Sequence, residues 1–200
     1  LHLKEKIGYG MGDAGSCMIW SVLALYLTWF YTDVYGLAPG VVGTLFLVIR
    51  IFDAFSDPVM GAICDRTRSR WGKFRPWLLW MALPFGLGAV LMFTTPDLSM
   101  NGKIVYAWVT YLVMSLIYTA INIPYCSVAG VITLNQKERL GCLSWRFFLN
   151  GLATLIVSSS ILPLTDWLGN GNRAAGFQLT MVIMGGAATL MFFRSEEHTS

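Results

Sequence analysis

Six apolar segments, each about as long as a bilayer is thick, constrain the fold of this chain more than any other feature of its sequence. Short polar stretches separate them, so neighbouring helices should run antiparallel. Of the 200 residues, 56% are hydrophobic and only 12% are charged, which is too little charge to coat a soluble globule of this size. The sequence therefore predicts an all-α membrane protein with six transmembrane helices. They are expected at Tyr9–Thr32, Val41–Cys64, Pro76–Thr95, Ile104–Val131, Leu140–Leu162 and Ala175–Phe193.

Basic residues predict the orientation of these helices. Nine lie in the N-terminal stretch and in the second and fourth polar stretches, whereas the other side receives only Lys103 and Arg173. Cytoplasmic loops carry the excess of Lys and Arg, so we expect a cytoplasmic N-terminus.

Composition also argues against several classes of function. The net charge of +3 does not indicate nucleic-acid binding, because the basic residues lie in short loops and form no basic face. Cys17, Cys64, Cys126 and Cys142 show no CxxC spacing, so they are expected to be packing residues rather than metal or redox groups. An enzyme is the least favoured class, since no nucleophile and base stand together in the chain.

The second segment contains three charges at helical spacing. Arg50, Asp53 and Asp57 are three and four residues apart, so they share one helix face. Each charge at mid-membrane costs about 2.5 to 3.5 kcal/mol, whereas each Leu, Ile, Val or Phe returns only about 0.3 to 0.6 kcal/mol. This face should therefore contact other helices, water or an ion, which indicates a functional site. The alternative is a structural ion pair between Arg50 and Asp53, which would leave Asp57 unpaired.

The carboxylates of this face suit a small hard cation. In the fourth segment Thr119 and Asn122 precede Pro124, whose missing N–H frees a backbone carbonyl. Together with Asp53 and Asp57, these oxygens would bind Na⁺ or Li⁺ directly, or the paired carboxylates would hold a proton instead. The membrane potential would drive the added charge inward with about 2.3 kcal/mol per 100 mV.

Other residues suit a sugar, which needs aromatic faces and bidentate polar groups. The candidates are Trp20, Tyr26, Tyr118, Asn122, Tyr125 and Arg146. Asp13 and Cys17 align with Trp20 on the first segment. Two alternatives remain open: Asp13 is a solvated acid near the start of its helix, or Arg146 merely extends its charge to the membrane surface.

The last seven residues, 194–200, do not continue the sixth apolar segment. Their sequence, RSEEHTS, resembles the translation of a sequencing adapter, so we expect a non-native tail here. We expect the chain to be a fragment, with residues 1–193 as one six-helix bundle.

Several motifs resemble the N-terminal half of the glycoside, pentoside and hexuronide:cation symporters, the group of the melibiose carrier within the major facilitator superfamily. They are KIGYGMGD, FYTDVYGL, VGTLFLVIRIFDAFSDPVMG, DRTRSRWGKFRPW, YTAINIPYCS and WRFF. The resemblance covers residues 4–193. It implies twelve helices in two six-helix bundles that rock about a central site, of which this chain supplies the first bundle. The C-terminal half of the same protein would be its partner.

The resemblance also assigns roles to residues of this chain. The family's cation-binding acids fall on Asp53 and Asp57, its helix-four threonine on Thr119, and its sugar-binding arginine on Arg146. The superfamily's cytoplasmic loop signature falls on Gly61, Asp65, Arg66, Arg68 and Arg70, where the acid and the arginines would form a charge relay.

Three positions depart from the melibiose carrier. Cys17 and Asn122 stand where that carrier has sugar-binding aspartates, and Cys126 replaces a tryptophan. The strings GMGDAGS and NIPYCS look more like the xyloside and pentoside branch of the family, with Asp13 as an added polar contact. Galactoside recognition is therefore not carried over.

The resemblance and the residues together predict a sugar:cation symporter of a bacterial inner membrane. The substrate would be a small xyloside-type glycoside, coupled to Na⁺, Li⁺ or H⁺ without any further cofactor. A hexuronide or another glycoside remains an alternative substrate. A channel or membrane sensor that uses the same acids remains an alternative of another class.

Overall fold

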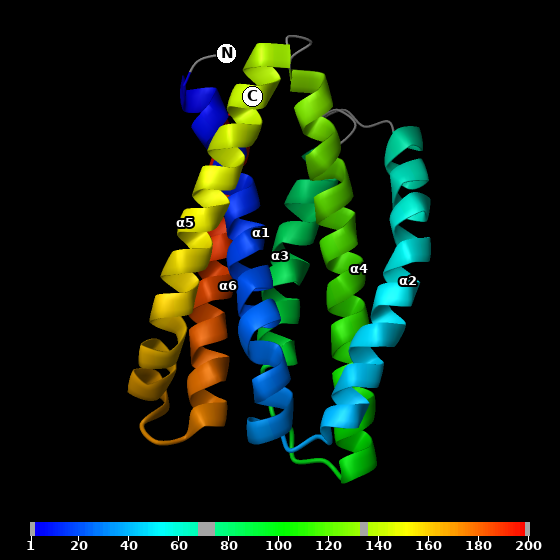
Figure 1. The fold of residues 1–200 in the computed structure, drawn as a ribbon, viewed down its shortest axis with the longest axis vertical. Coiled ribbons are helices and arrows are strands. Elements are labelled where there is room, and N and C mark those ends of the chain that lie inside the picture. The colour runs from blue at the N-terminus through cyan, green and yellow to red at the C-terminus, as the bar shows by residue number, and fades with distance from the viewer. Residues whose placement is uncertain (1–2, 68–74, 133–135, 199–200) are drawn as a thin grey trace.

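The computed structural model describes residues 3–67, 75–132 and 136–198. Over these residues the chain consists of helices joined by short connections, as Figure 1 shows. The elements are α1 (Leu3–Trp29), the π-helical turn η1 (Phe30–Val34), α2 (Pro39–Arg66), α3 (Arg75–Met92), α4 (Met100–Ile132), α5 (Gln136–Gly169) and α6 (Arg173–His198). Helices suit these apolar stretches because a bilayer interior offers no water to backbone N–H and C=O groups.

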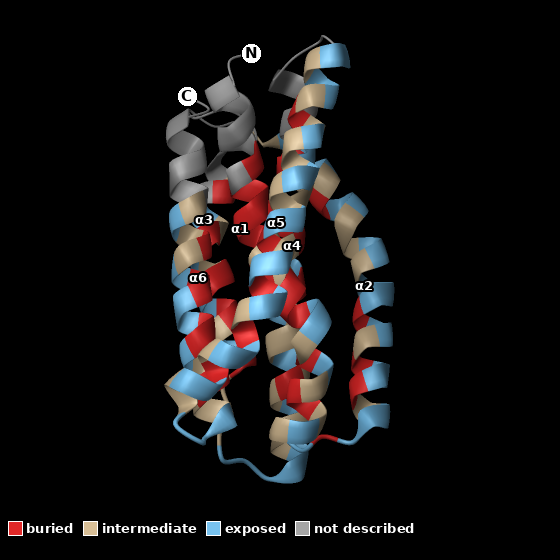
Figure 2. Ribbon diagram, turned by 60° about the vertical axis from the view of Figure 1, so that its left-hand side comes forward, coloured by how far each residue is buried: buried red, intermediate tan, exposed pale blue. Residues whose placement is uncertain are grey.

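The helices lie along a common long axis, with α1 in the middle of the bundle (Figure 1). Helix α1 packs against α5 and α6, and α3 packs against α4 and α6. Helix α2 stands at one edge and packs mainly against α4. In Figure 2 the buried residues of α2 follow one side of the helix, and most of its surface is exposed or intermediate. The α2–α4 contact is therefore what positions the charged face of α2.

Aromatic rings close the core where η1, the end of α3 and the start of α6 meet. Phe30, Phe93 and Phe177 are fully buried, and their ring centroids lie 4.8 to 5.6 Å apart. The chain then reverses through Gly36, whose φ of +79° strongly favours glycine. This cluster holds α1 in place relative to α3 and α6.

Close contact between α3 and α6 depends on small residues. A Cβ atom added to Gly86 would lie 3.2 Å from the backbone oxygen of Gly185. Small residues let membrane helices approach this closely, and van der Waals packing then stabilises the pair.

The predicted all-α architecture is confirmed. Five of the described helices are long and apolar enough to cross a membrane, and the sixth, α3, has a shorter apolar stretch, Trp80–Met92. Several boundaries differ from the predicted segments. Helix α5 continues through Pro163 to Gly169, where a polar joint was expected, and α6 continues to His198 rather than ending at Phe193. A proline costs a helix one hydrogen bond, which is not enough to end α5 at this position.

Candidate functional site

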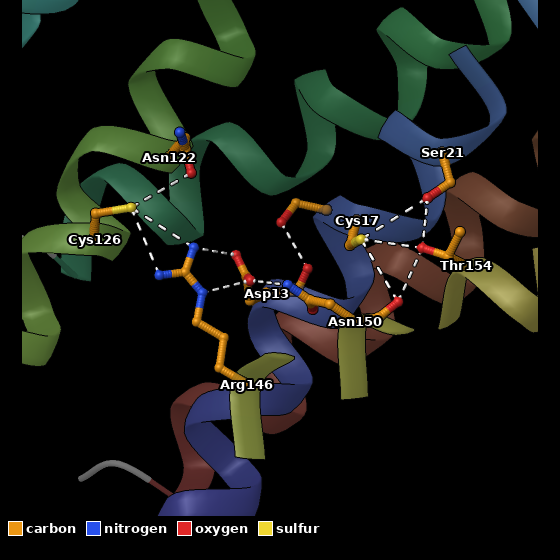
Figure 3. A network of polar contacts seen from close by, with 9 residues as sticks. Asp13, Cys17, Ser21, Asn122, Cys126, Arg146, Asn150 and Thr154 are labelled. Atoms are coloured by element: carbon orange, nitrogen blue, oxygen red, sulfur yellow. Dashed lines mark hydrogen bonds and ion pairs between the residues drawn. The ribbon is translucent and has the colours of Figure 1, made fainter. Parts of the chain in front are cut away.

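A bidentate ion pair joins α1 to α5. Arg146 Nε donates to Asp13 Oδ2 at 2.6 Å, and Nη2 donates to Oδ1 at 3.2 Å. Asn150 Nδ2 donates to the same Oδ2, as Figure 3 shows. Asp13 is only 5% exposed. The alternatives of a solvated Asp13 and of an Arg146 that only reaches for the membrane surface are therefore wrong.

Helix α4 brings further predicted sugar-site residues to the same arginine. Both Nη atoms of Arg146 lie 3.7 Å from Cys126 Sγ, and that thiol contacts Asn122 Oδ1, also at 3.7 Å. The guanidinium carbon lies 5.4 Å from the centroid of the Tyr125 ring, within cation–π range. Cys126 thus contacts Arg146 directly, and Asn122, one helical turn earlier, is linked to the arginine through that thiol (Figure 3).

Cys17 lies one turn after Asp13 and faces α5 in the same way. Its sulfur is 3.7 Å from Thr154 Oγ1 and 3.8 Å from Ser21 Oγ, and the two hydroxyls are 3.0 Å apart. Figure 3 shows these three residues beside the Asp13 cluster. Polar contacts therefore follow the α1–α5 interface over more than two turns.

An aromatic pair connects α1 to α4. The rings of Trp20 and Tyr118 stack with their centroids 4.2 Å apart and an interplanar angle of 13°. Such a pair contributes about 0.5 to 1.5 kcal/mol beyond its buried area. Tyr26, another predicted sugar-site residue, donates its hydroxyl to the backbone oxygen of Ser158 on α5 at 3.1 Å.

The two acids of α2 face two hydroxyls of α4. Ser115 Oγ donates to Asp53 Oδ1, and Thr119 Oγ1 donates to Asp57 Oδ1 at 3.0 Å. Asp53 and Asp57 are four residues apart on α2, as Ser115 and Thr119 are on α4. The two hydrogen bonds therefore lie one helical turn apart, and we call them the two rungs between α2 and α4. Ser115 and Thr119 are buried, and both acids are partly buried. Hard cations prefer oxygen ligands, so the carboxylates and hydroxyls of these four side chains suit such a cation.

Arg50 does not complete this pair of rungs. The residues that the structure describes include no ion pair between Arg50 and Asp53, so the predicted alternative of a structural pair is wrong. Arg50 instead lines a cavity of about 330 Å³ between α1, α2 and α4. The other lining residues are Trp20, Leu23, Ala24, Leu27, Thr28, Phe46 and Tyr111.

The predicted loop signature is only partly described. Gly61, Asp65 and Arg66 lie in the last turns of α2, where both charged residues are exposed. Arg68 and Arg70 lie outside the described residues. Beyond the helix end, Trp77 Nε1 donates to Thr67 Oγ1 at 3.2 Å, which links the two sides of this loop.

Sequence reasoning missed four residues of these clusters: Ser21, Ser115, Asn150 and Thr154. Helical spacing contained the signal for three of them. Ser21 follows Cys17 by four residues, Asn150 follows Arg146 by four, and Ser115 precedes Thr119 by four, so each shares a helix face with a predicted residue.

Comparison with known proteins agrees with this arrangement. Residues 8–195 match the family described as MFS/sugar transport protein. The chain is 50% identical over 98% of its length to the inner membrane symporter YicJ of Escherichia coli K12. It is 48% identical over 96% of its length to the putative glycoside/cation symporter YagG of the same strain. It is also 40% identical over 95% of its length to the isoprimeverose transporter of Lactiplantibacillus pentosus.

These alignments cover 44%, 42% and 40% of the three relatives, so the chain spans less than half the length of the curated proteins it matches. They confirm the resemblance found in the sequence motifs, and the described bundle corresponds to the N-terminal half of the fold. The chain belongs to the MFS/sugar transport protein family, a family of multi-pass membrane transporters.

Proposed function

We propose that the protein containing this chain is a glycoside:cation symporter of a bacterial inner membrane, with this chain as its N-terminal bundle and with a cytoplasmic N-terminus. The observation that carries the proposal is the pair of rungs between α2 and α4, where two acids meet hydroxyls rather than basic groups. Carboxylates without a fixed positive partner at membrane depth are costly, and a mobile cation offsets that cost.

The cation in this proposal is held by Asp53, Asp57 and Thr119, with Ser115 as a fourth oxygen donor. Na⁺ or Li⁺ would bind these oxygens directly, and H⁺ would bind one of the carboxylates. Each hydroxyl that now donates to an acid would rotate and present its lone pairs to a metal ion, which a hydroxyl does without moving its helix.

The sugar in this proposal lies beside Arg146, with Asp13, Cys17, Asn122 and Cys126 as its polar neighbours. The stacked rings of Trp20 and Tyr118 supply a face for the apolar side of a pyranose. A xyloside-type glycoside is the substrate we propose, in keeping with the similarity to the isoprimeverose transporter.

Helix α4 couples the two sites, because its faces serve both. Ser115 and Thr119 contact the acids, while Tyr118, Asn122 and Cys126 belong to the sugar cluster. A cation that fixes α4 against α2 would raise sugar affinity, and the sugar would raise cation affinity by the same factor. The loop signature at the end of α2 would then hold the outward-open state until both ligands are bound.

Uptake by the complete protein in membrane vesicles tests this proposal. A labelled β-xyloside should accumulate above its external concentration when an inward Na⁺, Li⁺ or H⁺ gradient is imposed, and only equilibrate without one. Asp97→Asn, an exposed acid outside the helices, serves as a control that should accumulate normally. Equilibration alone under every gradient would indicate a channel, and absence of any sugar flux would contradict transport.

A further inference from the structure

The guanidinium of Arg146 is already occupied. Two of its donors, Nε and Nη2, go to the two oxygens of the Asp13 carboxylate, and the side chains of the pair are 15% and 7% exposed. Asn150 adds a third donor to that carboxylate. Bidentate pairs of this kind fix the arginine plane and leave no net charge. The residue that is expected to bind sugar therefore offers hydrogen bonds without a surplus positive charge.

The remaining neighbours of the pair are also ill suited to an anion. The thiol of Cys126 contacts the guanidinium, the amide oxygen of Asn122 contacts that thiol, and the Tyr125 ring lies 5.4 Å from the guanidinium carbon. A substrate carboxylate placed here would exchange water for groups that cannot balance its charge, which is costly in a partly buried site. A sugar hydroxyl meets no such penalty.

Asn150 provides an acceptor for such a hydroxyl. Its Oδ1 atom is buried, yet it accepts no hydrogen bond from the residues that the structure describes. A buried acceptor without a donor is uncommon and calls for a partner. A hydroxyl of a neutral polyol that reached this atom would supply that donor, whereas a carboxylate has none to give.

Arg50 lines the cavity beside Trp20, yet it does not make this region positive overall. It lies on the same helix face as Asp53 and Asp57, so the three charges sum to one negative charge. One monovalent cation at the acids brings this sum to zero. With the Asp13–Arg146 pair already neutral, one cation balances the charges of these five side chains, and an uncharged sugar leaves that balance unchanged.

We infer that Asp13 determines the substrate class: by occupying Arg146 it selects uncharged glycosides against hexuronides, and Asn150 positions its carboxylate. This inference rests on the proposed function, since it concerns the sugar of the same symporter. Asp13 is a specificity-determining residue that acts through Arg146.

Three ring-matched probes test it on the complete purified protein: methyl β-xyloside, methyl β-glucoside and methyl β-glucuronide. The last two differ only in a hydroxymethyl against a carboxylate, so their affinity ratio isolates charge from size. Equilibrium binding, followed by displacement of a labelled xyloside, should give the wild-type protein at least a tenfold preference for the glucoside over the glucuronide. Asp13→Asn leaves Arg146 unpaired, so it should reduce that preference at least tenfold.

Two controls accompany the variant. Asp13→Glu keeps the charge and should keep the preference, and Asp97→Asn should leave it unchanged. Equal wild-type affinity for glucuronide and glucoside would overturn the inference, even if Asp13→Asn proves too unstable to purify. An unchanged ratio in a folded Asp13→Asn protein would overturn it as well. Binding is measured without a gradient, so failure of cation-driven uptake counts against symport and not against this selectivity.

Discussion

Two polar regions lie between helices of the bundle, and they differ in whether their acids are paired with a basic residue. Between α1 and α5, the acid Asp13 is matched by Arg146 in a bidentate pair. Between α2 and α4, Asp53 and Asp57 meet the hydroxyls of Ser115 and Thr119, and neither acid forms an ion pair within the described part of the chain. The charges of the first region balance each other within the chain, which supports a fixed geometry. The second is electrostatically incomplete, which is what a site for a travelling cation requires.

The largest expected effect follows from neutralising an acid between α2 and α4. Asp57→Asn should abolish gradient-driven accumulation in the complete protein while sugar binding persists, because the cation loses a ligand and its charge balance. The melting temperature should not fall, since the change removes a charge that costs about 2.5 to 3.5 kcal/mol at mid-membrane. Vesicle uptake and thermal melting measure the two effects. Wild-type accumulation in this variant would count against a cation role for Asp57.

Removing one partner of the Asp13–Arg146 pair should instead lower the stability of the protein. Arg146→Gln leaves the Asp13 carboxylate buried without its partner, so the free energy of unfolding in detergent should fall by about 3 kcal/mol. Asp13→Asn combined with Arg146→Gln should regain most of that loss, because neither charge is then left unpaired. Denaturant titration of the single and double variants measures this, and additive losses would show that the pair does not act as a unit.

A smaller effect is expected where the two regions meet, at the stack of Trp20 on Tyr118. Trp20→Leu should weaken xyloside binding about three- to tenfold, in line with the 0.5 to 1.5 kcal/mol of an aromatic pair. The cation dependence of the remaining binding should persist, since the α2–α4 rungs are untouched. Fluorescence or isothermal titration measures both quantities. Loss of the cation dependence would show that the stack, rather than α4 itself, connects the sites.

The smallest effect concerns a single oxygen donor. Ser115→Ala should raise the cation concentration needed for half-maximal uptake about fivefold, corresponding to about 1 kcal/mol for one hydrogen-bonding group. Ser127→Ala is the matched control, because that hydroxyl lies on the same helix and donates to the backbone oxygen of Ile123. A change of equal size in both variants would assign the effect to α4 as a helix rather than to the Asp53 rung.

The sequence was sufficient to predict the helical bundle and the face of α2, because both depend on local periodicity. Apolar segments of bilayer length give the helices, and the spacing of Asp53 and Asp57 places them on one face. Thr119 was matched to them through the family motif, and it does contact Asp57. The helix ends were less predictable, since α5 continues past Pro163 into a polar stretch.

The pairing of Asp13 with Arg146 was not predictable in the same way. The two residues are 133 positions apart, so their contact depends on how α1 and α5 are rotated and shifted against each other. For Arg50 the sequence favoured a contact that the structure does not contain. Its spacing to Asp53 favours an ion pair within α2, yet the cavity between α1, α2 and α4 receives its side chain instead. Tertiary packing decides both cases.

The claim that Asp53 and Asp57 hold the coupling cation is tested most directly by sugar affinity as a function of cation concentration. Binding of a labelled β-xyloside to the complete protein should be titrated with Na⁺, with Li⁺ and with pH, in the wild type and in the Asp53→Asn/Asp57→Asn double variant. We expect at least one cation to raise wild-type affinity tenfold or more, and the affinity of the double variant to be the same at every cation concentration. A double variant that keeps the wild-type cation response would contradict the claim.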